Sequence, residues 1–381
     1  MFSVAHRLST GSRQPPYAVR VRELVALDLT SANEVARHVR REWDAGNAVL
    51  IVDQRLPIGS RRDLMRRLGV HAVVEEVDRS AFDTRAEPML EGDALVVATS
   101  GTSGHAKGVV HTHSGLLAAS LATSAALGSG AEAHWLACLP LAHIGGFGVV
   151  TRAWHTGAAL TIHDSFDAAA VAASGASHVS LVATALARVE AQVFRKILLG
   201  GARPPATVPD NVTVTYGLTE SCGGIVYNRR PIPGVTVAVA SDGEILLRGP
   251  MIMSRYRNPD QPPAVDDKGW LHTDDVGRIE DGFLHVEGRR GDMIITGGEN
   301  VWPDAVERVL AAHPFIVECA VAGVVDAEWG ERVVAWIVPS YGEALSLESI
   351  RDFVAQTLPR HCAPRQLIIV ESLPRTSLGK V

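Results

Sequence analysis

Cysteine is scarce in this chain of 381 residues, and its four cysteines share no Cys-x-x-Cys spacing. Isolated cysteines do not build the zinc sites or disulfide frameworks that closely spaced cysteines form. The positions in question are Cys138, Cys222, Cys319 and Cys362. We therefore expect neither kind of site.

Long apolar runs and an excess of basic charge are missing as well. The apolar stretch at residues 145–150 is far shorter than the roughly 20 residues of a membrane-spanning helix. Residues 1–20 are basic but contain no apolar core of the kind found in secretory signals. The net charge of −6 gives no reason to expect a nucleic-acid partner. These absences predict a cytoplasmic protein with no membrane span and no bound nucleic acid.

Helical and strand-like segments alternate in the first part of the chain. The spacing of apolar residues predicts helices at residues 31–45 and 61–68, and strands at residues 48–53 and 94–98. Such alternation is typical of mixed or parallel sheets with helices on their faces.

The pattern changes twice further along the chain. Short β-rich runs separated by Gly, Asp and Pro predict a β subdomain at about residues 231–288. A compact α+β unit follows, with helices and strands predicted at residues 305–312, 317–325, 332–338, 347–357 and 366–370. The sequence thus predicts an α/β protein. Its large N-terminal domain, residues 1–289, has mixed sheets, flanking helices and the β subdomain, and a small α+β domain follows at residues 290–381.

A loop rich in Thr, Ser and Gly is the first motif with chemical meaning. It spans residues 99–108 and contains Lys107 near its end. Small residues let backbone amides approach phosphate oxygens, and the lysine adds a positive charge. The spacing does not fit a Walker A loop. We expect the loop between a strand and a helix, and a flexible polar loop is the alternative.

Three further motifs are weak when taken singly. Residues 216–220, Tyr-Gly-Leu-Thr-Glu, offer a hydroxyl and a carboxylate suited to a phosphate oxygen and Mg²⁺. Asp274 and Asp275, followed by Arg289, offer a carboxylate and a cation for the hydroxyls of a sugar. Lys380 ends a Pro-Arg-Thr-Ser-Leu-Gly-Lys run. The alternative for residues 216–220 is a turn that ends a strand, and for Asp274 and Asp275 it is a turn with a solvated charge pair. For Lys380 the alternative is an ordinary solvated charge.

Taken together, the order and spacing of these motifs resemble the adenylate-forming superfamily of acyl-CoA synthetases, adenylation domains and luciferases. The resemblance extends from about Asp93 to the C-terminus and includes the Gly-Gly-Glu-Asn-Val run at residues 297–301. It implies an ATP-dependent ligase that uses Mg²⁺ and coenzyme A. It also implies that the small domain is mobile and turns on a hinge near Gly291 and Asp292.

The resemblance implies a role for each matching residue. The residues matched to the phosphates of ATP are Thr99, Ser100, Gly101, Thr102, Lys107 and, for the α-phosphate, Thr219. Those matched to the adenosine are Gly200, Gly201, Tyr216, Gly217, Asp275 and Arg289. Glu220 matches the Mg²⁺ ligand, and Lys380 matches the lysine that bridges the acyl carboxylate and the phosphate. Gly298 lies on the run that the resemblance implies will face the site in the second step, when the thiol of coenzyme A attacks the acyl-adenylate.

A narrower resemblance is to the o-succinylbenzoate–CoA ligases of menaquinone biosynthesis, on residues 139–146, 198–202 and 216–226. It implies that a small-molecule carboxylic acid is the substrate and that His143 gates the acyl pocket. A packed core histidine is the alternative for His143. Arg152 is our candidate for the second carboxylate of such an acid, and a surface arginine at a helix end is its alternative.

Several questions stay open at this point. The acid could be another aryl or fatty acid, and the acceptor could be the thiol of a carrier protein. A non-catalytic nucleotide-binding relative is disfavoured because Lys107, Glu220, Asp275 and Lys380 are all present. The resemblance leaves a homodimer open. One departure stands out, because the superfamily usually has glycine where Asp274 stands, and we expect an altered turn there.

Overall fold

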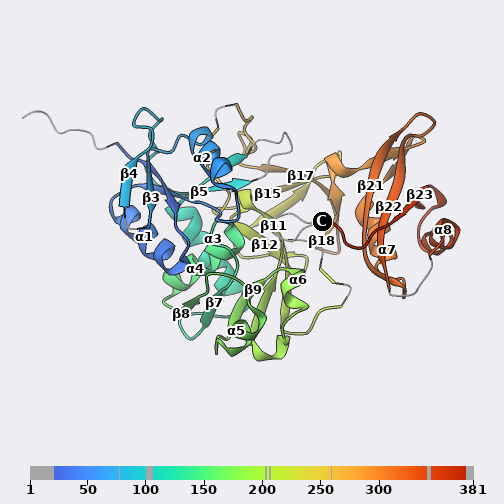
Figure 1. Cartoon of the computed structure of the whole chain (residues 1–381), viewed down its shortest axis with the longest axis horizontal. Helices are drawn as coiled ribbons and strands as arrows, with labels where there is room; N and C mark the ends of the chain where they lie inside the picture. The colour runs from blue at the N-terminus through green and yellow to red at the C-terminus, as the bar shows by residue number, and fades with distance from the viewer. Residues whose placement is uncertain are drawn as a thin grey trace, which may run out of the picture.

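The computed structural model describes residues 21–76, 78–99, 106–201, 204–205, 207–258, 260–340 and 345–374. Within them the strands form four sheets, two large ones of seven strands and two smaller ones (Figure 1). The predicted α/β class, with mixed sheets, a β subdomain and an α+β unit at the C-terminal end, is confirmed.

The first large sheet mixes parallel and antiparallel neighbours. Its central strands run parallel, and its β5–β6 and β16–β6 pairs are antiparallel. In spatial order the strands are β16 (Arg255–Tyr256), β6 (Lys107–Thr112), β5 (Asp93–Thr99), β2 (Ala48–Ile51), β1 (Leu24–Asp28), β3 (Ala72–Glu75) and β4 (Asp78–Ala81).

The second large sheet has a parallel core and an antiparallel edge. In spatial order its strands are β13 (Arg230–Pro231), β12 (Gly223–Tyr227), β11 (Val212–Leu218), β10 (Lys196–Leu199), β9 (His178–Leu181), β7 (His134–Ala137) and β8 (Ala159–Ile162). The parallel strands β7, β9 and β10 therefore end at one edge, where ligand sites form in α/β proteins.

Helices fill the space between the two large sheets and cover their outer faces. One apolar core joins both sheets to the inner helices α1 (Ala32–Asp44), α3 (His113–Leu127) and α4 (Ile144–Thr156). Two further cores lie on the outer faces, with α2 (Ile58–Arg67) on the first sheet and α5 (Ala168–Ala173) and α6 (Ala183–Leu186) on the second. The helix predicted at residues 31–45 begins because the Ser31 side chain caps the Glu34 amide.

The two smaller sheets follow in chain order. The β subdomain contains β14 (Thr236–Val239), β15 (Glu244–Arg248), β17 (Leu271–Glu280) and β18 (Phe283–Arg289). The C-terminal unit contains β19 (Ile294–Thr296), β20 (Glu299–Val301), β21 (Ile316–Asp326), β22 (Gly330–Pro339), β23 (Gln366–Ile369), α7 (Pro303–Leu310) and α8 (Leu347–Ala355). A short 3-10 turn, Arg290–Asp292, links the two sheets. The domain limit at residues 289/290 stays a prediction.

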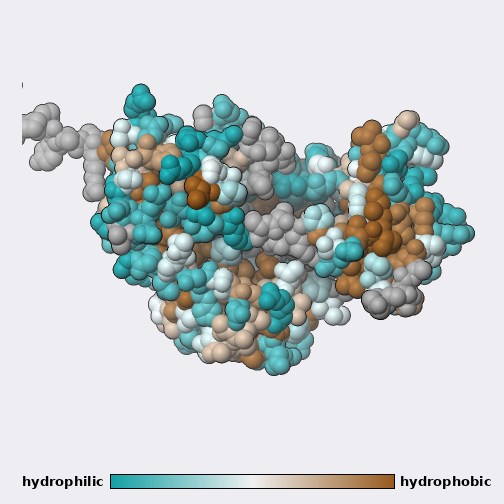
Figure 2. All heavy atoms as spheres, in the orientation of Figure 1, coloured by the Kyte–Doolittle hydropathy of each residue, from teal (hydrophilic) through white to brown (hydrophobic). Residues whose placement is uncertain are grey.

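The C-terminal unit has a core of its own, which residues of α7, α8, β21 and β22 share. Val321 of β21 is buried in this core, whereas Val317 and Val325 of the same strand are exposed. Figure 2 shows hydrophobic surface gathered on this unit.

One expectation about the phosphate loop is wrong. We predicted a helix directly after it, but β6 begins at Lys107 and pairs antiparallel with β5, and α3 begins only at His113. The described ends of the loop, Thr99 and Lys107, are therefore cross-strand neighbours in a hairpin. The run from Gly108 to Thr112 was misjudged because its valines favour a strand, which the Gly/Ser-rich context obscured.

Candidate active site

A cavity of about 620 Å³ lies where the parallel strands of the second sheet end. Cys138, Val182 and Gly200 follow β7, β9 and β10 and line it, and Asp53 lines it from the first sheet just beyond β2. Residues of α4 form a further wall, from Ile144 to Arg152. The cavity is thus placed by topology at the carboxyl edges of two sheets.

Asp275 and Tyr216 are joined at the edge of this site. The Tyr216 hydroxyl donates a 2.7 Å hydrogen bond to the Asp275 carboxylate. Arg289 lies opposite Asp275 on the neighbouring strand β18. Burial raises the pKa of Asp275, which the Tyr216 hydrogen bond and the Arg289 charge oppose. Burial and the Asp275 charge raise the pKa of Tyr216, so its hydroxyl stays a donor. The structure therefore brings together three residues that the sequence matched to the adenosine.

Asp274 adopts the left-handed backbone conformation, with φ of +60°. Glycine adopts this conformation at little cost, and aspartate is among the side chains that tolerate it. The Asp274 amide donates a 3.0 Å hydrogen bond to Glu244, whose other oxygen lies 2.9 Å from His272 Nδ1. Asp274 lies at an irregularity within β17, where the backbone keeps the geometry that a glycine would allow. The expectation of an altered turn finds no support in this backbone.

Alanine at Asp275 should weaken ATP binding by about tenfold to a hundredfold, the scale of lost hydrogen bonds to a charged group. Asp274→Ala should do much less, because the exposed Asp274 side chain contributes mainly backbone shape. Calorimetric titration of both variants with ATP checks this order. A larger loss for Asp274→Ala would shift our assignment of the turn by one residue.

Thr219 and Glu220 lie on a short 3-10 turn directly after β11. Thr219 lines the cavity, and the Glu220 Oε1 atom accepts a 2.9 Å hydrogen bond from the Tyr256 hydroxyl. The Lys107 ammonium lies over the ring of the same tyrosine, 5.1 Å from its centre. Two residues matched to ATP phosphates and Mg²⁺ thus meet on Tyr256, which the sequence did not single out.

This corner suits Mg²⁺ when the metal arrives with a nucleotide. Within the described ranges, no group of three or more His, Cys, Asp or Glu side chains could hold a metal alone. Mg²⁺ in nucleotide sites is usually held by one or two carboxylates together with phosphate oxygens and water. Glu220 offers that carboxylate.

Of the residues matched to the adenosine, the glycines line the cavity and Tyr216 does not. Gly200, Gly201 and Gly217 line the cavity. Gly217 lies at a bulge between β11 and β12, where a Cβ atom would clash with the Gly223 carbonyl. Among the described residues, those lining the cavity do not include Tyr216, whose hydroxyl binds Asp275 instead.

His143 contacts two residues from a distant segment at the cavity wall. Its Nε2 atom lies 3.1 Å from Asp53 Oδ2 and 2.7 Å from Arg55 Nη2. Burial would raise the pKa of Asp53, but hydrogen bonds from His143 and Arg55 outweigh it and hold the pKa well below its usual range. The histidine is therefore not a packed core residue. Asp53 and Arg55 were missed, although Asp53 directly follows a buried strand.

Arg152 is a buried residue on α4, only 9% exposed, which excludes the surface-arginine alternative. Its guanidinium stacks on Trp135, 4.4 Å from the ring centre. Among the described residues, neither its Nε nor its Nη1 atom has a hydrogen-bond partner. Burial lowers the pKa of the guanidinium, yet an arginine side chain stays charged in proteins. A buried guanidinium whose donors lack partners is costly. An anionic ligand in the cavity would pair with these donors.

Five further predicted site residues are not placed at the cavity. Ser100, Gly101, Thr102 and Lys380 lie outside the described residues. Gly298 lies in the turn between β19 and β20 and is not among the described residues that line the cavity.

Comparisons with known proteins agree with this geometry. Residues 33–257 match the family model described as AMP-binding enzyme, and residues 305–380 match the AMP-binding enzyme C-terminal domain. A probable 2-succinylbenzoate–CoA ligase of Mycobacterium tuberculosis is 38% identical over 316 residues, which is 76% of this chain and 82% of that protein. A 2-succinylbenzoate–CoA ligase of Bacillus cereus is 31% identical, covering 89% of this chain and 78% of that protein.

Solved structures give the same result. The o-succinylbenzoate CoA synthetase of Bacillus subtilis, in complex with its acyl-adenylate intermediate, superposes with a TM-score of 0.82 at 27% identity. The match covers 95% of this chain and 87% of that one. Another structure of that synthetase contains ATP and a magnesium ion. The chain belongs to the AMP-binding enzyme family, alongside the 2-succinylbenzoate–CoA ligases.

Proposed function

We propose that this protein joins 2-succinylbenzoate to coenzyme A, with ATP converted to AMP and pyrophosphate. The relatives of the previous subsection support the ligase reaction and its substrates. The main support from this chain is the buried Arg152 guanidinium on the wall of an otherwise largely apolar cavity. Its Nε and Nη1 atoms have no hydrogen-bond partner among the described residues.

A dicarboxylic acid suits this cavity better than a fatty acid does. One carboxylate must reach the ATP phosphates near Thr219, while the other is carried deep into the pocket. An unpaired buried carboxylate is costly, and pairing with a guanidinium offsets that cost. Arg152, Cys222 and Tyr227 line the same cavity. The aromatic ring of the acid would pack among the apolar side chains of α4 and β12.

The reaction has two steps that balance without a further reactant. A carboxylate oxygen of the acid attacks the α-phosphorus of ATP, forms a mixed anhydride and releases pyrophosphate. The sulfur of coenzyme A then attacks the acyl carbon, forms the thioester and releases AMP. Such a site works by positioning reactants and stabilising charge. We assign phosphate contacts to Thr219 and Lys107 and ribose contacts to Asp275 and Arg289.

Glu220 is the residue we assign to the metal. Mg²⁺ supplies neutralisation of phosphate charge when it is bound. The small domain would turn about residues 291 and 292 between the steps, as two-state hinges do. His143, held by Asp53 and Arg55, would border the acyl entrance.

No helix in the described part of the chain is long and apolar enough to cross a membrane. We place the reaction in the cytoplasm, because ATP and coenzyme A are available there. The partners of the protein in this proposal are the small molecules alone.

Pyrophosphate exchange with a panel of acids tests the proposed function. Exchange should be fastest with 2-succinylbenzoate and slower with simple aryl or fatty monocarboxylates. A preference for a monocarboxylate would reject the acid and leave the ligase reaction standing. Absence of exchange with every acid would favour a non-catalytic nucleotide-binding protein. Offering coenzyme A or a carrier protein then separates the two possible acceptors.

Arg152→Ala should raise the KM for 2-succinylbenzoate by one to two orders of magnitude, roughly the effect of losing a charged hydrogen bond. The KM for ATP should stay nearly constant. The matched control is Arg188→Ala, which removes an exposed arginine of the same cavity that lies over Phe166. If Arg188→Ala raised the KM for the acid more than Arg152→Ala did, the pairing of Arg152 with the second carboxylate would be wrong.

A further inference from the structure

Residues 253–258 run along the edge of the first sheet, between the exit of the phosphate loop and Glu220. The Met253 amide donates a 2.8 Å hydrogen bond to the Glu220 carbonyl, and the Arg257 amide donates a 2.7 Å bond to the Gly108 carbonyl. Between these contacts β16 pairs with β6. The segment is thus bonded at one end to the metal-site turn and at the other to the strand that begins with Lys107.

Tyr256 lies at the centre of this segment and contacts both charged residues of the site. Its hydroxyl donates to Glu220 Oε1 at 2.9 Å, and its ring lies beneath the Lys107 ammonium at 5.1 Å. An ionised carboxylate can only accept hydrogen bonds, so the Tyr256 hydroxyl is the donor in this contact.

Asn258 fixes the backbone on both sides of Lys107. Its side-chain oxygen accepts a 2.8 Å hydrogen bond from the Gly108 amide, and its side-chain nitrogen lies 3.5 Å from the Ala106 carbonyl. The lysine therefore leaves the loop at a fixed point, with its ammonium above the tyrosine ring.

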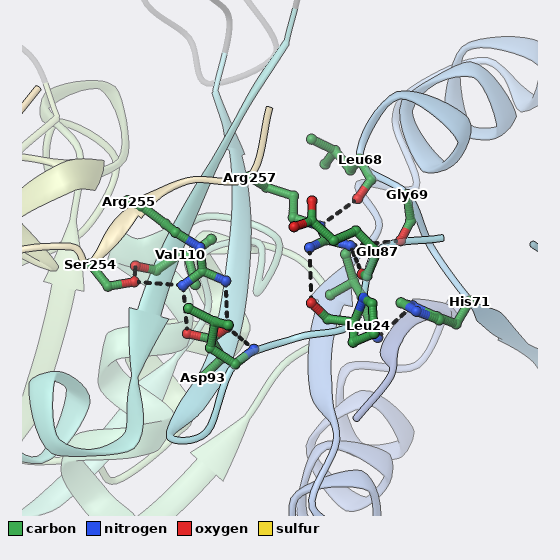
Figure 3. A network of polar contacts seen from close by, with 12 residues as sticks. Leu24, Leu68, Gly69, His71, Glu87, Asp93, Val110, Ser254, Arg255 and Arg257 are labelled. Atoms are coloured by element: carbon green, nitrogen blue, oxygen red, sulfur yellow. Dashed lines mark hydrogen bonds and ion pairs between the residues drawn. The ribbon is translucent and has the colours of Figure 1, made fainter. Parts of the chain in front are cut away.

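Two arginines anchor the segment to the body of the sheet (Figure 3). Arg255 binds both oxygens of the buried Asp93 carboxylate, at 3.0 and 2.7 Å. Arg257, which is buried, donates to backbone carbonyls of Leu68, Gly69 and Glu87. Tyr256 lies between these anchors, so its position does not depend on the ligand.

We propose that Tyr256 is a positioning residue of the nucleotide site, which holds the Glu220 carboxylate and the Lys107 ammonium apart in the arrangement that Mg²⁺ and ATP require. This inference rests on the proposed function. A lysine and a glutamate that both contact this tyrosine would attract each other without it, and a direct ion pair between them would have to break before metal and phosphate could bind. Instead, the tyrosine hydroxyl donates a hydrogen bond to one carboxylate oxygen of Glu220, and its ring makes a cation–π contact with the Lys107 ammonium. Such preorganisation avoids the cost of rearrangement during binding.

The test uses calorimetric binding of ATP to the full chain, with Mg²⁺ and with a chelator. In the unaltered protein Mg²⁺ should strengthen ATP binding. Tyr256→Phe removes only the hydroxyl, so it should reduce this Mg²⁺-dependent gain by about tenfold, as expected for a hydrogen bond to a charged group. ATP affinity in chelator should change less than about twofold, because the ring beneath Lys107 remains.

Tyr256→Leu also removes the ring and should weaken ATP binding in chelator as well, by roughly threefold. Thr161→Val is the matched control, because it removes one part-buried hydroxyl bond, 2.8 Å to His134, on the distant strand β8. It should leave the Mg²⁺-dependent gain intact. Thermal melting of each variant shows whether folding is retained.

The possible outcomes distinguish the role of Tyr256 from the proposed ligase function. If the unaltered protein gains affinity from Mg²⁺ and Tyr256→Phe gains as much, the role of Tyr256 is overturned and the proposed function stands. An equal loss in Thr161→Val would also overturn it, since the effect would then be general. If Mg²⁺ does not strengthen ATP binding by the unaltered protein, the proposed function and this inference both fail.

Discussion

Replacing Lys380 with alanine should slow formation of the acyl-adenylate by about a hundredfold to a thousandfold, while thioester formation from preformed acyl-adenylate stays nearly unchanged. The expected size is that of removing one group that stabilises charge in the transition state. Lys380 lies outside the described residues, so the assignment rests on its Gly-Lys motif. The lysine would bridge acyl carboxylate and α-phosphate in the first step and turn away with the small domain before the second.

Measuring the two half-reactions separately decides this point. Pyrophosphate exchange reports the first step, and thioester formation from synthetic acyl-adenylate reports the second. Lys268→Ala, at an exposed lysine of the β subdomain, is the control for loss of a lysine charge and should affect neither. Equal losses in both half-reactions of Lys380→Ala would contradict the assignment.

Glu220→Gln should lower turnover by about a hundredfold and raise the Mg²⁺ concentration needed for half-maximal rate. Glutamine removes the negative charge but can still accept the hydrogen bond from Tyr256. The change therefore isolates the contribution of the charge to metal binding. Magnesium titrations of pyrophosphate exchange measure it.

A glutamate elsewhere supplies the control for this variant. Glu91 is exposed and pairs with Arg22 on the surface, so Glu91→Gln should leave the magnesium dependence unchanged. An ordinary magnesium dependence in Glu220→Gln, with only the turnover lowered, would mean that Glu220 does not hold the metal.

Local patterns in the sequence predicted much of the fold. The amphipathic spacing and Ser31 cap gave α1, and the apolar run at residues 94–98 gave β5. The strand β6 was missed although its valines favour a strand, because its Gly/Ser-rich context obscured this signal. The cross-strand pairing with β5 and β16, which also stabilises β6, is not visible in a linear pattern.

The site was predicted only as far as its motifs extend. Residues in short motifs, such as Thr219 and Glu220, could be named because the resemblance fixes their order. Asp53 meets His143 across 90 positions of chain, and Tyr256 meets Glu220 across 36. Such pairs are formed by tertiary packing and leave no local signal. Arg152 was named from sequence, but its burial and stacking on Trp135 appear only in the structure.

The most direct test of the proposed function is to identify the product by mass spectrometry. Purified protein is mixed with 2-succinylbenzoate, ATP, Mg²⁺ and coenzyme A, and both AMP and the acyl product are quantified. We predict one coenzyme A thioester of 2-succinylbenzoate for each AMP released, and without coenzyme A only the acyl-adenylate and pyrophosphate. ATP binding without either product, or AMP release without a thioester, would contradict the proposed ligase reaction.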